Sequence, residues 1–376
     1  MKNSQSIRLL LKKLMRIDFG LIINFYLIIS LSLIFVYSAT LHKNNTFFIK
    51  EIYWIILGSA VFIAVSLIDY KIFAKYSKVL YGLNIFLLTI VLIFGKVVKG
   101  SKRWILLGPF SFQPSELAKI ILILTFSEFL VHKYQRGIRG WIGFFRAGIH
   151  ILLPFVLILR EPDLGTSLVL MFLFYAMTFL HGVDLLPFIS IIMTKISMIP
   201  VLFFLLKDYQ KTRILVFLKT LFSPNSLVSD KVAYKEGWNV LQSIIAVGSG
   251  GIVGKGLFQG TQDKLKFLPE SHTDFIFSVL AEETGIIGSA FLLFLYFWLI
   301  YRIITIGNKC SEPFGQLVSY GIASVIFFHT FVNIGMVIGM LPVTGLPLLF
   351  MSYGGSSYVL TFGMLGIVES IKIYDS

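Results

Sequence analysis

Ten long apolar runs constrain the fold of this chain more than any other feature of its sequence. A helix needs about 20 mainly apolar residues to cross a bilayer. The fifth run is shorter than the others, which leaves a tilted or re-entrant segment open there as an alternative to a full span. We predict transmembrane helices at residues 17–40, 51–68, 76–95, 115–132, 147–160, 164–182, 186–206, 275–305, 314–340 and 345–370.

The composition indicates the same class of protein. Hydrophobic residues make up 56% of the chain and charged residues only 14%, whereas soluble domains carry about 25% charged residues. The single cysteine, Cys310, excludes an intrachain disulfide and a cysteine-based metal cluster. We therefore expect an all-α polytopic membrane protein, built as one integral membrane domain over residues 1–376.

Lysine and arginine are unevenly distributed among the segments that join the spans. With the N-terminus inside, the inner segments hold fifteen of them and the short outer loops hold seven, and cytoplasmic loops carry such an excess. This bias predicts a multi-pass protein of the cytoplasmic membrane with both termini in the cytoplasm and the long segment 207–274 outside. The net charge of +14 is then mostly a topology signal, and we expect no nucleic-acid partner.

One outer loop opposes that charge rule. Residues 96–104 contain four cations, among them Lys102 and Arg103. Such a cluster either contacts the anionic headgroups of membrane lipids or holds a substrate that carries phosphate. Charge alone leaves both interpretations open.

The long outer segment has the pattern of surface helices followed by a glycine-rich stretch. Residues 209–222 place apolar side chains at helical spacing with cations between them, which predicts an amphipathic helix on the membrane surface. Residues 236–247 predict a second helix. The stretch 248–257 lacks the full P-loop pattern, so we interpret it as a close-approach loop whose backbone amides face a substrate.

Charged residues inside an apolar helix are the first sign of a functional site. They cost about 2.5–3.5 kcal/mol each at the centre of a membrane helix, and they are functional hypotheses by default. Glu116 and Lys119 lie three residues apart, hence on one helical face, just after Pro114. They form either a self-neutralising pair that lets the helix insert or a pair that orients a substrate or a catalytic carboxylate.

Two further polar stretches lie at predicted outer ends of spans. Glu161 and Asp163 flank a proline between two spans, which indicates a rigid polar turn that binds substrate or is simply solvated. Glu270, His272 and Asp274 precede the eighth span. His272 and Asp274 form only a weak metal-binding pattern, and Asp274 is as well explained as a helix cap as it is as a catalytic carboxylate.

Several ordered motifs together resemble the SEDS family, the family of RodA, FtsW and SpoVE, and resemble its RodA members most. The resemblance covers nearly the whole chain. It rests on SKRW, GPFSFQPSELAK, REPDLGTS, GKGLFQGTQ, FLPESHTDFIF and LPVTGLPLLFMSYGGSS.

This resemblance implies a ten-span peptidoglycan glycosyltransferase that polymerises lipid II into glycan strands at the outer membrane face during cell elongation. It also implies a class B penicillin-binding protein as transpeptidase partner, within an elongation complex of membrane proteins. The essential aspartate of the family corresponds to Asp274, and its glutamate and lysine correspond to Glu116 and Lys119. His272 and Arg103 also match the motifs.

The chemistry of this reaction gives each residue an expected role. The acceptor hydroxyl needs a base, for which we choose Asp274. The polyprenyl pyrophosphate leaving group needs positive charge, for which Lys119, Arg103 and Lys102 are candidates. We expect the remaining candidates to bind substrate: Asp163, Glu161, His272 and Glu270. A divalent ion, Mg²⁺ or Mn²⁺, stays open as a cofactor, because the sequence offers no recognisable ligand set.

Two other functions use the same features. A lipid II flippase also needs charges within the membrane, but its site must be reachable from both faces, typically near the midplane. A scaffold that recruits a transpeptidase needs no catalytic residues, and it leaves the charged outer motifs unexplained.

Overall fold

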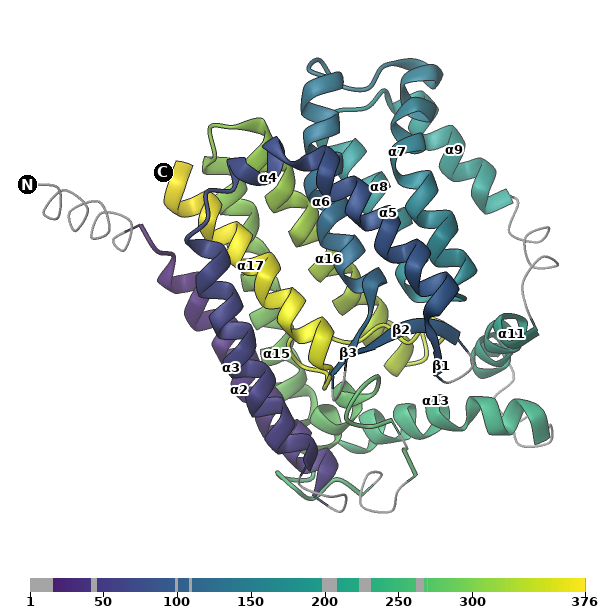
Figure 1. Cartoon of the computed structure of the whole chain (residues 1–376). Coiled ribbons are helices and arrows are strands. Elements are labelled where there is room, and N and C mark those ends of the chain that lie inside the picture. Colours follow the sequence, from purple (N-terminus) through teal and green to yellow (C-terminus); the bar gives the residue numbers. More distant parts are fainter. Residues whose placement is uncertain are drawn as a thin grey trace, which may run out of the picture.

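The computed structural model describes residues 16–41, 46–98, 101–107, 110–197, 208–222, 231–261, 267–268 and 270–375. These residues form a bundle of long helices with a small sheet and two further helices at one end (Figure 1). In chain order the elements are α2 (Phe19–Thr40), α3 (Thr46–Ser66), α4 (Lys71–Lys75), α5 (Ser77–Phe94), β1 (Lys96–Val98), β2 (Ser101–Leu107), β3 (Phe110–Phe112), α6 (Pro114–Lys133), α7 (Gly140–Arg160), α8 (Leu164–His181), α9 (Leu185–Ser197), α11 (Asp208–Phe222), α13 (Lys231–Ser249), α15 (Ile276–Lys309), α16 (Pro313–Val337) and α17 (Gly355–Asp375).

Each of the ten predicted spans overlaps a helix, although residues 198–206 of the seventh lie outside the described residues. The membrane-protein class and its helical architecture are confirmed. Among the described residues, eight helices are long and apolar enough to cross a membrane. The other two are α6, which carries several charged residues, and α9, which is described only as far as Ser197. The exact number of ten spans therefore stays a prediction.

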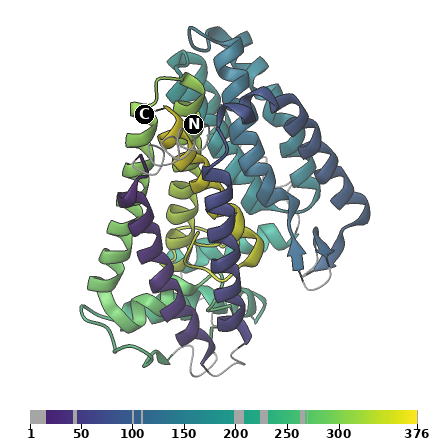
Figure 2. The same cartoon turned by 60° about the vertical axis from the view of Figure 1, so that its left-hand side comes forward.

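The two ends of the described chain lie together. Arg16 donates a hydrogen bond from Nη1 to the Ile373 carbonyl over 3.3 Å, and the start of α2 and the end of α17 lie at the upper end of the bundle in Figure 1. The sheet, α11 and α13 lie at the opposite end, with α13 running across the long helices (Figures 1 and 2). We call these the terminal end and the loop end. The placement of both termini in the cytoplasm stays a prediction.

The helices differ in how much of their surface the protein itself covers. In α16 and α17, 67% of the most apolar window is buried, against 17% in α3 and 22% in α5. The outer helices expose apolar side chains such as Ile56 and Phe94. An apolar outer surface of this kind suits contact with lipid rather than water.

The predicted outer loop 96–104 forms a sheet, which the sequence analysis missed. Strands β1, β2 and β3 pair antiparallel in that order, with Ile105 opposite Phe112 and Leu107 opposite Phe110. The apolar residues here are too few to span a membrane, and their pairing in short strands uses their backbone hydrogen-bonding groups.

The tenth predicted span begins too early, because α17 starts at Gly355 rather than at residue 345. Residues 341–354 form an irregular segment, the hub loop, whose carbonyls accept hydrogen bonds from side chains of surrounding helices. Ser32 donates to the Met351 carbonyl over 2.9 Å, and Tyr296 donates to that of Leu349. Irregular backbone is tolerated at membrane depth where protein surrounds it, so apolar sequence alone does not distinguish it from a span.

The fifth span also differs from its prediction. Helix α7 is continuous from Gly140 to Arg160, seven residues longer at its start than the predicted 147–160, and it contains Pro154. A re-entrant segment is therefore wrong. The chain instead begins this helix with exposed Trp141, Ile142 and Phe145, which extend the apolar surface beyond Arg146.

The glycine-rich stretch binds another part of the protein with its amides. Helix α15 is interrupted at Gly285, which has φ 65° and ψ −158°. The Lys255 and Gly256 amides donate to the carbonyls of Glu282 and Glu283, each over 3.0 Å. A Cβ on Gly254 would lie 2.1 Å from the Glu283 carbonyl oxygen, so glycine is required there. The amides of Lys255 and Gly256 support a broken helix, and for these two amides the interpretation that they face a substrate is wrong.

Candidate active site

Helix α6 carries a fully buried lysine at the centre of a polar cluster. Lys119 donates from Nζ to both carboxylate oxygens of Glu116, over 2.8 and 2.9 Å, and lies 3.1 Å from Nε2 of His329 on α16. Lys119 and His329 are both 0% exposed. The ammonium group has three N–H donors, and these three contacts use all of them.

The contacts of His329 define its protonation. The Pro347 carbonyl, 3.0 Å from Nδ1, can only accept a hydrogen bond, so Nδ1 carries the proton. The Lys119 ammonium can only donate, so Nε2 is the acceptor. His329 is therefore a neutral imidazole that joins the buried lysine to the hub loop.

One turn further along α16, Asn333 makes a parallel connection. Its Nδ2 donates to the Leu346 carbonyl over 2.8 Å and to the Asp274 carbonyl over 3.0 Å. Residues four apart on a helix are separated by about 6 Å along its axis. The α16 helix thus holds the backbone of Asp274 about one turn from the contact between His329 and Lys119.

Asp274 is not the cap of α15. The N-cap residue is Phe275, which makes no side-chain capping hydrogen bond, and the helix begins at Ile276. The Asp274 side chain is partly exposed, and a Cβ on Gly345 would lie 3.8 Å from its Oδ2. Of the two readings that the sequence left open, the capping role is wrong for this aspartate.

Asp163 fixes the start of α8 and joins it to the start of α6. Its Oδ1 accepts from the Thr166 amide over 3.1 Å, and its Oδ2 accepts from Gln113 over 2.9 Å and from Ser115 over 3.3 Å. Arg103 on β2 places Nη1 3.6 Å from Oδ1. Asp163 is thereby engaged on both oxygens, so its geometry is that of a positioning residue.

Glu161 lies two residues earlier, in the turn between α7 and α8. It is 0% exposed, and neither of its carboxylate oxygens has a hydrogen-bond partner among the described residues. Burial, with the Asp163 carboxylate as second cause, raises the pKa of Glu161 from 4.5 to about 9, although Arg103 opposes the shift. Glu161 is therefore a neutral carboxylic acid at neutral pH.

The hub loop contacts the helices that carry these residues, at the loop end of the bundle. A Cβ on Gly165, in the first turn of α8, would lie 3.0 Å from the Thr344 carbonyl, so α8 and the hub loop are in close contact. The structure thus gathers six of the sequence candidates at the starts of α6, α8 and α15 and on β2: Arg103, Glu116, Lys119, Glu161, Asp163 and Asp274.

The other three candidate residues make different contacts or lie outside the described side chains. The His272 ring packs against Phe47, with centroids 4.8 Å apart, and its carbonyl accepts from the Tyr353 amide over 2.9 Å. Glu270 accepts from the Thr273 hydroxyl over 3.2 Å within its own turn. Lys102 pairs with Val97 in the sheet, and its side chain lies outside the described part of the structure.

His329 and Asn333, which connect the groups of the site, were not predicted from the sequence. The signal that was available is the rarity of ionisable and strongly polar residues in a membrane helix, here four residues apart on one face. As to metal binding, the described ranges hold no group of three His, Cys, Asp or Glu side chains that is arranged around a common ion.

A helical membrane protein with a buried, fully paired charge cluster and a partly exposed aspartate at one end of its bundle is the class that the fold and site define. Over residues 12–376 the sequence matches the model of the FtsW/RodA/SpoVE family, described as cell cycle protein. The chain belongs to this family, which the motifs had already indicated as the SEDS family, and by that membership it is a peptidoglycan glycosyltransferase.

Curated relatives and a solved structure agree with that membership. The chain is 38% identical over 326 residues to the peptidoglycan glycosyltransferase MrdB of Escherichia coli K12, covering 86% of this chain and 85% of MrdB. It is 36% identical over 370 residues to a probable peptidoglycan glycosyltransferase FtsW of Wigglesworthia glossinidia brevipalpis, covering 95% and 94%. A chain of a peptidoglycan synthase complex that coordinates polymerization and crosslinking superposes with a TM-score of 0.78 at 28% identity, covering 96% and 99%.

Proposed function

We propose that this protein polymerises lipid II into glycan strands at the outer face of the cytoplasmic membrane, with its loop end outside and both termini in the cytoplasm. The family relationship supports the peptidoglycan substrate, and the distribution of lysine and arginine supports the orientation. The observation that carries the catalytic part is the tie from the Asp274 backbone to Asn333, one helical turn from the Lys119 cluster.

In this proposal Asp274 is the general base that takes the proton of the acceptor hydroxyl as it attacks the anomeric carbon. Its carboxylate is partly exposed at the loop end and is not used to cap a helix. Its backbone is held by Asn333 and the hub loop, so the carboxylate is positioned before substrate arrives. A positioned base contributes typically 10²–10⁴-fold to rate.

Arg103 is the best-placed cation for the pyrophosphate leaving group. Its side chain is 31% exposed, and its Nε has no hydrogen-bond partner among the described residues. Preorganised positive charge stabilises a leaving group that departs as an anion. Lys102, Glu270 and His272 remain proposed substrate-binding residues, and a Mg²⁺ or Mn²⁺ ion at the pyrophosphate is an additional proposal.

Lys119 does not have the role that its charge suggested in the sequence, which was to neutralise the pyrophosphate. Because its three donors are used by Glu116 and His329 and it is fully buried, it acts as a positioning residue. It fixes His329, and α16 then fixes both the hub loop and Asp274. Glu161 and Asp163 support the same end of the bundle from α7 and α8.

A class B penicillin-binding protein is the proposed partner, and it crosslinks the strands that this protein makes. The similarity to a chain of a synthase complex that couples polymerization with crosslinking supports this assignment. We assign the protein to elongation and rod shape on its motif resemblance to RodA, whereas relatives named MrdB and FtsW match at similar identity. Expression in cells depleted of their own elongation enzyme tests that role: rod shape should return, and rescue of division alone would contradict it.

The activity is tested with purified protein, lipid II and the partner transpeptidase. Wild-type protein should form glycan polymer, and Asp274→Asn should form it at least about 100-fold more slowly while folding and binding the partner normally. Asp69→Asn, at the terminal end, is the matched control and should retain the wild-type rate. Near-normal polymerisation by Asp274→Asn would move the base elsewhere, and lipid II translocation without polymer would favour a flippase.

A further inference from the structure

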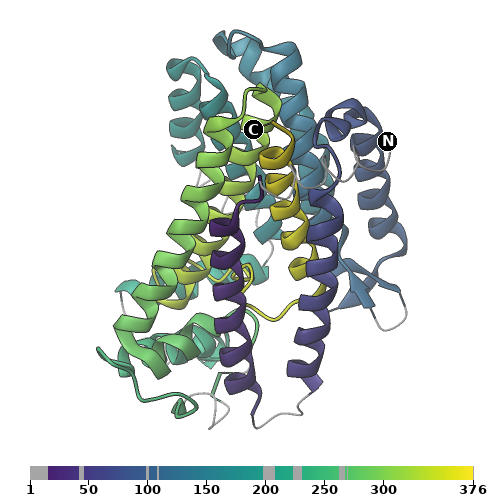
Figure 3. The same ribbon diagram turned by 90° about the vertical axis from the view of Figure 1, so that its left-hand side faces the viewer.

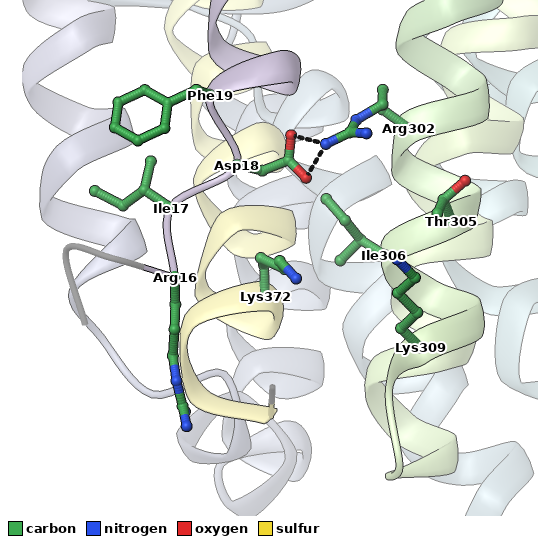
Figure 4. Close-up of a pocket in the computed structure, with 9 residues that line it drawn as sticks. All are labelled: Arg16, Ile17, Asp18, Phe19, Arg302, Thr305, Ile306, Lys309 and Lys372. Atoms are coloured by element: carbon green, nitrogen blue, oxygen red, sulfur yellow. Dashed lines mark hydrogen bonds and ion pairs between the residues drawn. The ribbon is translucent and has the colours of Figure 1, made fainter. Parts of the chain in front are cut away.

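A cavity of about 390 Å³ opens at the terminal end, far along the bundle from the candidate active site. It lies between the start of α2, the last turns of α15 and the end of α17 (Figure 4). The lining residues are Arg16, Ile17, Asp18, Phe19, Arg302, Thr305, Ile306, Lys309 and Lys372.

Cations dominate this cavity. Four of its lining residues are lysine or arginine, and only Asp18 is acidic. Figure 4 shows Arg302 and Lys372 directed into the cavity from different helices, whereas Arg16 points away, toward the Ile373 carbonyl that it binds. Lysines at helix ends on this side also serve as a topology signal, but that signal does not require them to converge on one cavity.

The single acidic lining residue, Asp18, offsets only one of the four cations. Asp18 caps α2 by accepting from the Leu21 amide over 2.8 Å, and it forms an ion pair with Arg302. Behind it, the buried Glu369 accepts from the Asp18 amide over 2.8 Å. Among the described residues, Lys309 forms no ion pair within 4 Å of a carboxylate, so the cavity retains a positive excess.

Arg302 is built into the wall of the cavity. A Cβ on Gly20 would lie 3.2 Å from its guanidinium carbon, so glycine lets α2 lie directly against this group. The Arg302 Nε is buried and has no hydrogen-bond partner in the described part of the chain. A donor of this kind costs free energy unless an acceptor reaches it.

An apolar surface leads away from the cavity along the bundle. Phe19 lines the cavity and is 64% exposed, and Ile23 and Leu27 continue its row one and two turns further along α2. On the neighbouring α15, Tyr301 and Phe297 are also exposed. Helices α2 and α15 run side by side (Figure 3), so exposed apolar side chains extend from the cavity along both helices.

We propose that this cavity binds the phosphate headgroup of an anionic membrane phospholipid, whose acyl chains lie along α2 and α15. Basic pockets between membrane helices bind such headgroups. The apolar side chains beside the cavity favour a lipid over a free phosphate ion, because only a lipid has acyl chains that can pack against them. The lipid belongs to the leaflet at the terminal end, so this site is separate from the catalytic proposal.

Native mass spectrometry of the full-length protein in detergent tests the proposal by titration with phosphatidylglycerol and, separately, with phosphatidylethanolamine. One phosphatidylglycerol should bind in preference to phosphatidylethanolamine. Each lysine near an anionic headgroup contributes roughly five-fold to affinity, so Lys309→Gln/Lys372→Gln should bind phosphatidylglycerol roughly 25-fold more weakly. Both side chains lie at helix ends, and an unchanged melting temperature would show that the variant folds.

The control variant is Lys75→Gln/Lys78→Gln, which removes two exposed cations at the same end but outside the cavity. It should bind phosphatidylglycerol as the wild type does. Equal losses in both double variants, or no loss in the cavity variant, would overturn the site. Inorganic phosphate that displaces phosphatidylglycerol at equal concentration would show a site for the free ion and overturn the lipid assignment.

Discussion

Replacing Lys119 by methionine distinguishes a pair that positions the active site from one that only lets α6 enter the membrane. Methionine has similar volume and no charge, so the substitution removes the ammonium group and its three hydrogen bonds. It leaves the Glu116 carboxylate, 6% exposed, without the cation that both its oxygens contact. Glu116→Gln makes the complementary change and leaves the lysine without its anion.

The expected costs follow from burial. Removing one partner of a buried ion pair destabilises a protein by about 3–5 kcal/mol, whereas replacing both charges is often neutral or stabilising. In Lys119→Met/Glu116→Gln the remaining loss is the hydrogen bond to His329, about 1 kcal/mol. Each single variant should therefore be less stable than the double variant. Lys71→Met is the control, since its pair with Glu312 is half exposed and should contribute less than about 1 kcal/mol.

Two measurements on the same purified variants separate the roles. Thermal unfolding in detergent should show the single variants melting roughly 6–10 °C lower, at about 2 °C per kcal/mol for a chain of this size, and the double variant close to the wild type. Polymerisation of lipid II should stay low in both variants that lack Lys119, because neither holds His329 in place, and it should be lowered in Glu116→Gln, in which Lys119 loses the carboxylate that orients it. A double variant that regains both stability and activity would refute the positioning role, and additive losses of stability would refute the pairing itself.

Three further outcomes are expected. Because the folded protein holds the Glu161 carboxyl protonated beside Asp163, with a pKa near 9 against an ordinary 4.5, stability should fall as pH rises through that window. The fall should be roughly 2–3 kcal/mol between pH 7 and 9, and Glu161→Gln should flatten the dependence of melting temperature on pH. Asn333→Leu should cost about 2–4 kcal/mol, since two buried carbonyls lose their donor, and should slow polymerisation; a normal rate would separate Asp274 from this support. Val253→Cys in a Cys310→Ser background should react with an impermeant thiol reagent on intact spheroplasts, because Val253 is exposed at the loop end, and protection there would reverse the proposed orientation.

Helix positions were predictable because a membrane span needs a long apolar run, and length is read directly from sequence. The prediction was wrong where apolar residues are enclosed by protein instead of lipid. Gly345 to Phe350 read as the start of a span, but their carbonyls accept hydrogen bonds from His329, Asn333 and Tyr296. Those donors lie on α15 and α16, and the sequence of residues 345–350 does not indicate that they are there.

In the candidate site, too, contacts between residues close in sequence were predictable, whereas contacts between distant residues were not. The contact between Glu116 and Lys119 follows from a spacing of three residues, and the structure has it at 2.8 Å. His329 contacts Lys119 across 210 positions of sequence, so only the packing of α6 against α16 brings them together. Likewise, the capping role of Asp274 depended on where α15 begins, and a shift of one residue in that boundary removes it.

The hub loop has a consequence for how the protein is made. Ser32 of α2 donates to the Met351 carbonyl, so this hydrogen bond of the first described helix forms only after more than 300 further residues have been synthesised. During translation the early helices enter the bilayer before the hub loop exists, so the hydrogen bonds between them and the hub loop cannot yet form, and missing hydrogen bonds in lipid are costly. A chain truncated before residue 341 should therefore insert but remain loosely assembled and sensitive to membrane proteases, and the loop end should reach its final structure only when α17, the last described helix, has been made.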